Sequence, residues 1–301
     1  MRRGEQMHKD DVEVSDALAR VLVDSQFPEY AGLALRRLPI SGTVNVIFRL
    51  GPHLSLRFPR RAGDTNATRA ALEREAERAA EFADVATVDA SRPVSIGAPA
   101  HGYPMAWSIQ TWLPGATASP TDAADSAEFA CDLAALVSAL RATPTRGRRF
   151  TGGGRGGDLR SHDDWVERCL SRSQHLVDVT ALRRLWHRLR TTPRERPDLM
   201  THGDLIPGNM LLADGRLVGV LDTGGFGPAD PALDLVAAWH LLGDDAREAF
   251  RAALDCDDTE WNRGKAWAFE QAIGAAWYYQ NTNPDMHEMG MTTLSRLLES
   301  E

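Results

Sequence analysis

The spacing of apolar and polar residues changes along the chain and divides it into two parts. In the first part, residues 11–23 place apolar side chains at helical spacing, which predicts an amphipathic helix. Residues 45–50 and 54–58 are short alternating runs separated by a Gly-Pro turn, which predicts a β-hairpin. Residues 64–84 are rich in Ala, Glu and Arg and contain almost no helix breakers, so we expect a second helix there.

The first part ends in a connector and a strand. Residues 93–99 begin and end with proline, which predicts an extended connector. Residues 107–113 read as a strand that a Pro-Gly turn closes. The order helix, hairpin, helix, strand is typical of a small α+β lobe. We therefore expect an N-terminal domain over residues 1–113, built on a small antiparallel sheet.

The second part is mainly helical. Residues 122–142 carry an apolar stripe, and residues 163–190 and 233–301 continue the helical pattern. Between them, residues 199–222 alternate strand and turn signals. We expect a C-terminal domain over residues 114–301 that is helical around a small β-turn-β insert.

A glycine-rich segment interrupts the helices of this second part. Residues 151–157 (TGGGRGG) match neither G-x-x-x-x-G-K-[ST] nor a G-x-G-x-x-G sequence that follows a strand. We therefore expect a flexible surface loop here rather than a phosphate-binding loop.

The composition is that of a globular protein with an ordinary core. Of the 301 residues, 43% are hydrophobic and 25% are charged. No apolar run of about 18 residues occurs, and the start of the chain is polar, so we expect neither a membrane span nor a signal peptide. Cys131, Cys169 and Cys256 lie far apart and form no C-x-x-C pair. This pattern favours a reducing compartment, and we expect a cytoplasmic protein without disulfides or structural zinc.

Acidic residues are concentrated near the C-terminus. Residues 204–301 carry 6 basic and 17 acidic side chains, whereas the two kinds balance over residues 1–113. An acidic segment repels nucleic acid and anionic lipid and attracts cations. We therefore expect no nucleic-acid partner and no membrane partner.

The candidate chemistry lies in one loop and the hairpin that follows it. Asp204 and Asn209 are five residues apart in a loop that Pro207 and Gly208 keep from being helical. The hairpin returns the chain so that Asp222 lies beside Asn209. Oxygen ligands of this kind suit Mg²⁺, which takes one or two protein oxygens and leaves other positions to water and phosphate. Asp204 is then free to accept a proton from a hydroxyl.

This spacing resembles the catalytic set of protein kinases, with H-G-D in place of H-R-D. The signature H-G-D-x-x-x-G-N of the aminoglycoside phosphotransferase family, the kinase-like antibiotic-modifying enzymes, is met within residues 202–209. The resemblance covers nearly the whole chain. At residues 41–45, 56–60 and 230–235 the sequence is similar to an actinobacterial branch of this family. The resemblance implies a two-lobed protein-kinase-like fold of the α+β class.

The resemblance also implies a role for each residue of the loop and hairpin. Asp204 would be the catalytic base that orients the substrate hydroxyl. Asn209 and Asp222 would bind Mg²⁺. His202 and Asp234 would support the catalytic loop without reacting.

The N-terminal lobe would hold the nucleotide. Arg57 stands where kinases have a phosphate-binding lysine, and a guanidinium can pair bidentately with phosphate. Its expected partner is Glu75, with Glu73 and Glu77 as alternatives on the same helix. The other expected nucleotide contacts are Ser41, Thr43 and Asn45 at the phosphates and the Thr111 carbonyl and Leu113 amide at the purine.

The resemblance implies transfer of the γ-phosphoryl group of ATP or GTP to a hydroxyl of a small molecule. The expected acceptor is an antibiotic, an aminoglycoside first, whose inactivation would give resistance. Alternative acceptors are a macrolide, a nucleoside antibiotic or a small metabolite alcohol such as choline or homoserine.

Alternatives of another functional class are a non-catalytic pseudokinase and a metal-dependent hydrolase. The intact catalytic set argues against the first, and the lack of H-x-H and H-E-x-x-H against the second. We expect a monomer or a homodimer.

Overall fold

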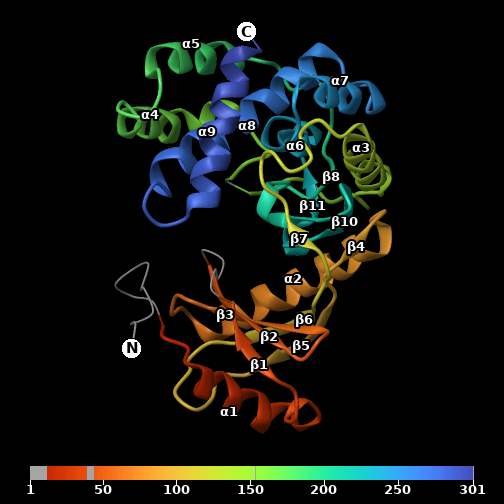
Figure 1. Cartoon of the computed structure of the whole chain (residues 1–301), viewed down its shortest axis with the longest axis vertical. Helices are drawn as coiled ribbons and strands as arrows, with labels where there is room; N and C mark the ends of the chain where they lie inside the picture. Colours follow the sequence, from red (N-terminus) through yellow and green to blue (C-terminus); the bar gives the residue numbers. More distant parts are fainter. Residues whose placement is uncertain (1–11, 39–43, 153, 301) are drawn as a thin grey trace. The chain divides into compact units, whose positions relative to one another are not determined.

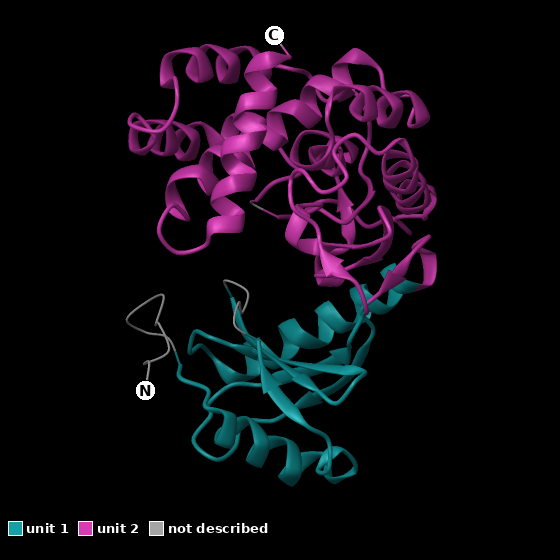
Figure 2. Ribbon diagram, viewed as in Figure 1, with its two compact units in different colours: residues 1–83, 91–113 teal, residues 84–90, 114–301 magenta. Residues whose placement is uncertain are grey.

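A computed structural model describes most of the chain, namely residues 12–38, 44–152 and 154–300. The chain divides into two compact units, which Figure 2 distinguishes by colour. Unit 1 comprises residues 1–83 and 91–113, and unit 2 comprises residues 84–90 and 114–301. Unit 1 contains an antiparallel sheet and unit 2 is mainly helical, so the predicted α+β class is confirmed. The assignment of nucleotide binding to one unit and catalysis to the other stays a prediction.

Unit 1 is built on a five-stranded sheet with the strand order β1-β2-β3-β6-β5 (Figure 1). Every neighbouring pair in this sheet is antiparallel. The predicted hairpin is confirmed, because β2 and β3 pair from Asn45 with Pro59 to Leu50 with Leu54. The strands are β1 (Leu35–Arg37), β2 (Asn45–Leu50), β3 (Leu54–Pro59), β5 (Pro93–Gly97) and β6 (Trp107–Thr111).

One expectation for unit 1 is wrong. The proline-flanked segment expected to be a connector is the edge strand β5, which pairs with β6. Proline is compatible with this position because Pro93 is the first residue of an edge strand, where a missing N–H donor costs no ladder bond.

Helices complete unit 1. Helix α1 (Asp16–Gln26) begins later than predicted, because the Ser15 hydroxyl accepts the Leu18 N–H and caps the first turn. It is followed by the 3₁₀ turn η1 (Pro28–Tyr30). Helix α2 (Thr65–Val85) agrees with the prediction within one residue at each end.

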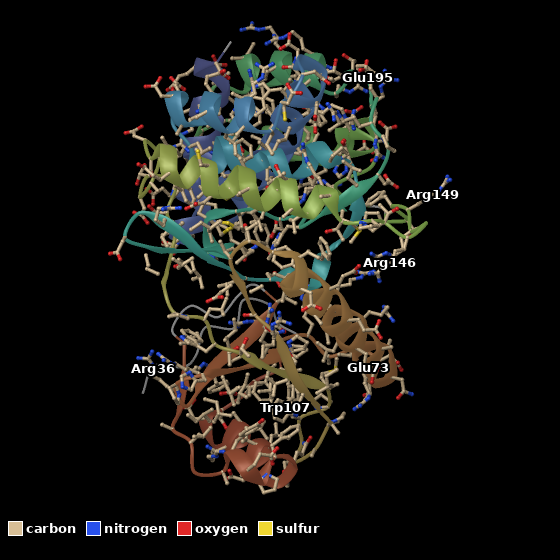
Figure 3. All side chains as sticks on the ribbon, turned by 90° about the vertical axis from the view of Figure 1, so that its right-hand side faces the viewer. Arg36, Glu73, Trp107, Arg146, Arg149 and Glu195 are labelled. Atoms are coloured by element: carbon tan, nitrogen blue, oxygen red, sulfur yellow. The ribbon has the colours of Figure 1, made fainter. Side chains whose placement is uncertain are left out.

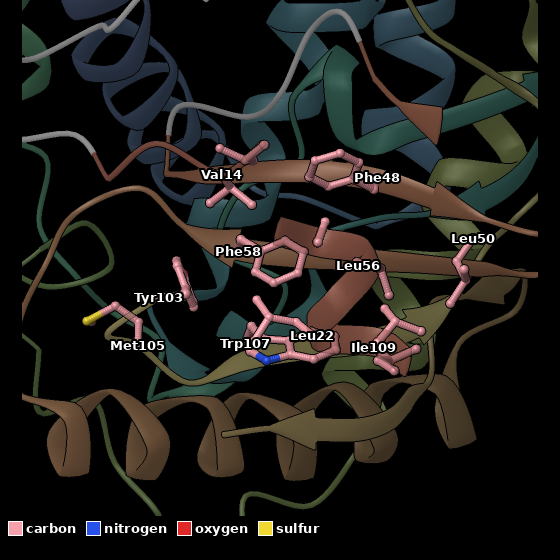
Figure 4. Close-up of a cluster of buried hydrophobic side chains, with 13 residues drawn as sticks. Val14, Leu22, Phe48, Leu50, Leu56, Phe58, Tyr103, Met105, Trp107 and Ile109 are labelled. Atoms are coloured by element: carbon pink, nitrogen blue, oxygen red, sulfur yellow. The ribbon is translucent and has the colours of Figure 1, made fainter. Parts of the chain in front are cut away.

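An aromatic cluster forms the centre of the unit 1 core (Figure 4). The Phe58 ring centroid lies 4.8 Å from that of Trp107, 5.4 Å from that of Tyr103 and 5.8 Å from that of Phe48. Trp107 lies in the interior of the unit (Figure 3) and is completely buried. Edge-to-face and offset-stacked pairs of this kind add stabilisation beyond the burial of apolar area.

Unit 2 surrounds a central helix. Helix α8 (Asp258–Tyr278) is buried on all sides over most of its length and packs against α4, α5, α6 and α9. The other helices are α3 (Ala127–Ala142), α4 (Asp163–Arg172), α5 (Val179–Leu189), α6 (Val236–Leu241), α7 (Asp244–Ala253) and α9 (Pro284–Glu299). Among the helices of the described residues, none is both long enough and apolar enough to cross a membrane.

Short strands and 3₁₀ turns lie between these helices, and they carry the predicted β-turn-β insert. The strands are β4 (Asp89–Ala90), β7 (Ala116–Thr117), β8 (Leu199–Thr201), β9 (Met210–Ala213), β10 (Arg216–Val220) and β11 (Gly227–Ala229). The 3₁₀ turns are η2 (Leu159–His162), η3 (Pro207–Asn209), η4 (Thr223–Gly225) and η5 (Pro231–Leu235). Strands β4, β10, β9 and β7 form one sheet in that order, and β11 pairs with β8.

We expect Phe58→Ala to lower the free energy of unfolding of unit 1 by about 3–5 kcal/mol, because it removes the ring at the centre of the aromatic cluster. Hydrogen exchange of unit 1 amides at increasing denaturant measures this change. The control is Val94→Ala on the same sheet, where the side chain is 38% exposed and the change should stay within about 0.5 kcal/mol. Equal losses in the two variants would contradict the role of the cluster.

Candidate active site

The loop between β8 and β9 and the β9–β10 hairpin bring the predicted catalytic residues of unit 2 together. In the hairpin, Val220 pairs with Met210, and the Leu221 N–H donates to the Asn209 carbonyl at 2.8 Å. The residue after Leu221 is Asp222, so the hairpin places Asp222 next to Asn209 along the paired backbones. The geometry predicted for the hairpin is therefore present.

A buried carboxylate holds the start of the catalytic loop. Asp234, from η5, accepts the backbone N–H of His202 at 2.9 Å and that of Gly203 at 2.8 Å, one on each oxygen. Its side chain is fully buried, and this burial raises the pKa of Asp234, while the two N–H donors act in the opposite direction. Gly203 has a φ of 84°, a left-handed conformation that favours glycine.

The His202 imidazole links the two ends of the site. Its Nδ1 accepts the Asp204 N–H at 3.2 Å, and its Nε2 lies 3.0 Å from the Leu221 carbonyl oxygen. An N–H can only donate and a carbonyl can only accept, so the ring is the Nε2–H tautomer. The imidazole thus ties the residue before Asp222 to Asp204 and supports the loop from inside.

Asn209 orients the Asp204 carboxylate. The Asn209 Nδ2 donates to the Asp204 carbonyl at 2.9 Å and to Asp204 Oδ2 at 3.2 Å. Both contacts use the amide nitrogen, so neither occupies the amide oxygen of Asn209, which can bind another ligand. An amide oxygen and the neighbouring Asp222 carboxylate are hard donors that fit Mg²⁺. Asp222 itself has a φ of 57°, a left-handed conformation that aspartate tolerates better than most residues.

A residue of the glycine-rich segment, which was predicted to be a surface loop, contacts the candidate base. Arg155 Nη2 donates to Asp204 Oδ1 at 3.0 Å, and its Nη1 lies 3.9 Å from Glu270 Oε2. The other Glu270 oxygen lies 3.0 Å from His162 Nδ1, and this hydrogen bond to Glu270 raises the pKa of His162. The glycine-rich segment therefore belongs to the site. The isolated arginine among its glycines was the only sequence signal for this contact.

A second polar group reaches Asp204 from helix α8. Gln271 Nε2 lies 3.4 Å from Asp204 Oδ1, and Gln271 Oε1 lies 2.7 Å from His240 Nε2. His240 Nδ1 lies 2.8 Å from the Thr293 hydroxyl. No sequence pattern indicated these contacts, because they join α6, α8 and α9 to a loop far away in the chain.

The residues expected to hold nucleotide belong to unit 1, and the structure describes all but two of them. Ser41 and Thr43 fall outside the described residues. Asn45 begins β2, Arg57 lies on β3 and Thr111 ends β6, with Leu113 two residues later. The Thr111 carbonyl already accepts the Ser91 hydroxyl at 3.3 Å.

The helix that carries the expected partner of Arg57 is α2. Glu75 and Glu77 are exposed on this helix. Glu73, which is labelled in Figure 3, accepts a hydrogen bond from Arg69 one turn earlier at 2.9 Å. The pairing of Arg57 with Glu75 stays a prediction.

Comparison with known proteins identifies the class. The family model of the phosphotransferase enzyme family (APH) matches residues 36–267. The chain belongs to this family, as the motifs of the loop and hairpin indicated.

Individual relatives agree with this assignment. An aminoglycoside 3'-phosphotransferase from Salmonella typhimurium is 28% identical over 156 residues, which cover 46% of this chain and 54% of the relative. A second aminoglycoside 3'-phosphotransferase, from Escherichia coli, is 29% identical over 157 residues with the same coverage. The chain thus matches about half the length of these curated relatives.

Solved structures of similar fold cover nearly the whole chain. The GDP complex of aminoglycoside 2'-phosphotransferase-IIIa has a TM-score of 0.68 at 17% identity and covers 95% of this chain and 99% of its own. The macrolide 2'-phosphotransferase MphH from Brachybacterium faecium has a TM-score of 0.60 at 18% identity and covers 93% of this chain and 98% of its own. The two-lobed kinase-like fold predicted from the sequence is therefore confirmed.

We expect Asp234→Asn to lower the free energy of unfolding by about 1–3 kcal/mol, because an amide NH₂ then faces a buried backbone N–H that loses its acceptor. Thermal unfolding measures the loss. Asp164→Asn, which changes an exposed acid at the start of α4, is the matched control and should leave stability nearly unchanged. A similar small effect in both variants would show that the loop does not depend on Asp234.

Acid should destabilise the protein through His240. Burial lowers the pKa of His240 to about 4, whereas the pKa of a histidine in the unfolded chain is about 6.5. Between these values the unfolded chain binds a proton that the folded chain does not. The free energy of unfolding therefore falls on acidification, by about 3 kcal/mol over the whole window.

The matched variant for this effect is His240→Gln, which has no titrating side chain at the position. Between pH 7 and pH 5 the original protein should lose about 2 kcal/mol more unfolding free energy than the variant does. Denaturant titrations at the two pH values measure both losses. Equal losses of unfolding free energy in the two proteins would show that His240 does not stay neutral in the folded state.

Proposed function

We propose that the protein is a Mg²⁺-dependent small-molecule kinase that transfers the γ-phosphoryl group of ATP or GTP to a hydroxyl of an antibiotic. The observation that carries the proposal is the environment of Asp204. Its carboxylate is oriented by Asn209, its loop is fixed by Asp234, and its side chain is 35% exposed, so an acceptor can reach it. Family membership and the nucleotide complexes among similar structures support a nucleotide donor.

In the proposed reaction, Asp204 orients the acceptor hydroxyl and accepts its proton. The hydroxyl oxygen forms a bond to the γ-phosphorus, the bond from this phosphorus to the β–γ bridging oxygen breaks, and the nucleoside diphosphate leaves. The Asn209 amide oxygen and the Asp222 carboxylate would hold Mg²⁺. When bound, this ion supplies positive charge to the phosphates. In unit 1, Arg57 and Asn45 would hold the phosphates of the nucleotide.

The first acceptor to test is an aminoglycoside. The curated relatives are aminoglycoside 3'-phosphotransferases, and one similar structure is a gentamicin complex of an aminoglycoside phosphotransferase. A macrolide is the second candidate, because two similar structures are macrolide 2'-phosphotransferases. Phosphorylation would inactivate the antibiotic and give resistance.

The test is phosphoryl transfer by the purified protein with Mg²⁺, using ATP and GTP against aminoglycosides, macrolides and nucleoside antibiotics. We expect Asp204→Asn to lower kcat by about 10²–10⁴-fold while nucleotide binding is retained, because only the proton acceptor is removed. Product mass and initial rates measure transfer, and calorimetry measures nucleotide binding.

The matched control is Asp214→Asn in the turn of the β9–β10 hairpin. Asp214 is exposed and has a φ of 51°, which asparagine also tolerates, so kcat should not change. Full activity of Asp204→Asn would overturn the mechanism. Tight nucleotide binding without transfer to any acceptor or to water would instead support the pseudokinase alternative.

A further inference from the structure

Gln271, His240 and Thr293 form a polar chain behind Asp204, in which every hydrogen bond is donated in the direction of Asp204. The Asp204 carboxylate can only accept when it is ionised, so the Gln271 group 3.4 Å from its Oδ1 is the NH₂. The Gln271 amide oxygen must then accept from His240 Nε2–H, at 2.7 Å. His240 Nδ1 therefore carries no proton and accepts from the Thr293 hydroxyl at 2.8 Å, a shorter contact than the 3.5 Å from this hydroxyl to the Trp239 carbonyl.

The polar chain is buried, whereas the side chain of Asp204, which it reaches, is 35% exposed. Gln271 is 6% exposed, and His240 and Thr293 are completely buried. A buried donor or acceptor without a partner is costly, so each member fixes the orientation of the next. A flipped Gln271 amide would bring its NH₂ against His240 Nε2–H and its oxygen against the Asp204 carboxylate. The burial that keeps His240 neutral, with a pKa of about 4, is consistent with this polarity.

Charged groups face the chain from several elements. Arg155 donates to the same Asp204 oxygen from the glycine-rich segment, and Glu270 lies beside Gln271 on α8 and pairs with Arg155. Arg296, from α9, donates to the Trp239 carbonyl and, like Arg155, disfavours a proton on His240. Two donors from different elements thus converge on Oδ1, and Asn209 contacts Oδ2.

We propose that Gln271, oriented by His240 and Thr293, is a positioning residue that, together with Asn209 on the other oxygen, sets the angle of the Asp204 carboxylate toward the acceptor hydroxyl. This inference rests on the proposed function, because it requires Asp204 to be the catalytic base. Arg155 is 35% exposed on a loop, whereas Gln271 is held in the interior by α8. The buried donor therefore defines the angle that the base keeps while substrate enters and product leaves.

The principal variant is Gln271→Glu, which keeps an acceptor for His240 and nearly the same volume but replaces the donor that faces Asp204. We expect kcat to fall about tenfold or more, both for transfer to the antibiotic acceptor and for Mg²⁺-nucleotide hydrolysis by water. The nucleotide KM should stay within about twofold, because the nucleotide contacts proposed above lie elsewhere. Gln271→Leu, which also removes the acceptor, should lower kcat at least as much.

The matched control is Lys265→Met, which changes a similarly buried polar residue on α8 that donates to the Ser300 carbonyl. It should leave kcat within about twofold if only the contact to Asp204 matters. In an Asp204→Asn background, Gln271→Glu should cause no further loss of the residual rate, because residues that act as a unit are not additive. A further tenfold loss there would show that Gln271 acts through general stability.

The role of the polar chain is tested with variants of His240. His240→Gln keeps side-chain donors that can reach the Gln271 oxygen, whereas His240→Leu has none, so the first variant should retain several-fold more kcat than the second at equal folded fraction. Equal rates in the two variants, or full kcat in Gln271→Glu, would overturn the proposal and leave the catalytic role of Asp204 intact. If the unmodified protein transfers phosphate neither to an acceptor nor to water, the proposed function and this inference both fail.

Discussion

The two hydrogen bonds from the His202 and Gly203 backbone to the buried Asp234 carboxylate fix the start of the catalytic loop. A carboxylate in the interior is costly unless donors surround it. The loop therefore has to keep both N–H groups pointed inward, and the positive φ at Gly203 follows from that requirement. Asp204, the next residue, has a side chain that is 35% exposed and so stays accessible.

The rest of the unit 2 site extends from this turn through backbone contacts. The His202 ring joins the Asp204 N–H to the Leu221 carbonyl, so the loop and the end of the hairpin share one rigid connection. Asn209 then bonds back to Asp204. The loop that carries the base and the hairpin end that carries Asp222 are thus held by hydrogen bonds between side chains and backbone groups. Such preorganisation is what a reaction limited by positioning and charge stabilisation requires.

The sequence predicted the parts of this site that are local in the chain. The H-G-D-x-x-x-G-N spacing and the hairpin after it were sufficient to bring Asp204, Asn209 and Asp222 together, because both features are set by short-range turn chemistry. The contacts of Arg155 and Gln271 with Asp204 cross 49 and 67 residues of sequence and depend on how α8 is buried. Hydrophobic periodicity predicted helical structure over the residues of α8, but it did not indicate which polar residue of this helix faces the catalytic loop.

The same limit applies to the charge of the C-terminal segment, which predicts an attraction of cations. Several of its acids are internal structural groups: Asp230 and Asp234 are buried in η5 or at its start, and Glu260 and Glu270 are buried on α8. Each of the four has a basic or backbone partner within the fold. The net charge of the segment therefore overstates the field that an acceptor meets. That field depends on the local balance at Asp204, where Arg155 brings a positive charge to within hydrogen-bonding distance of the base.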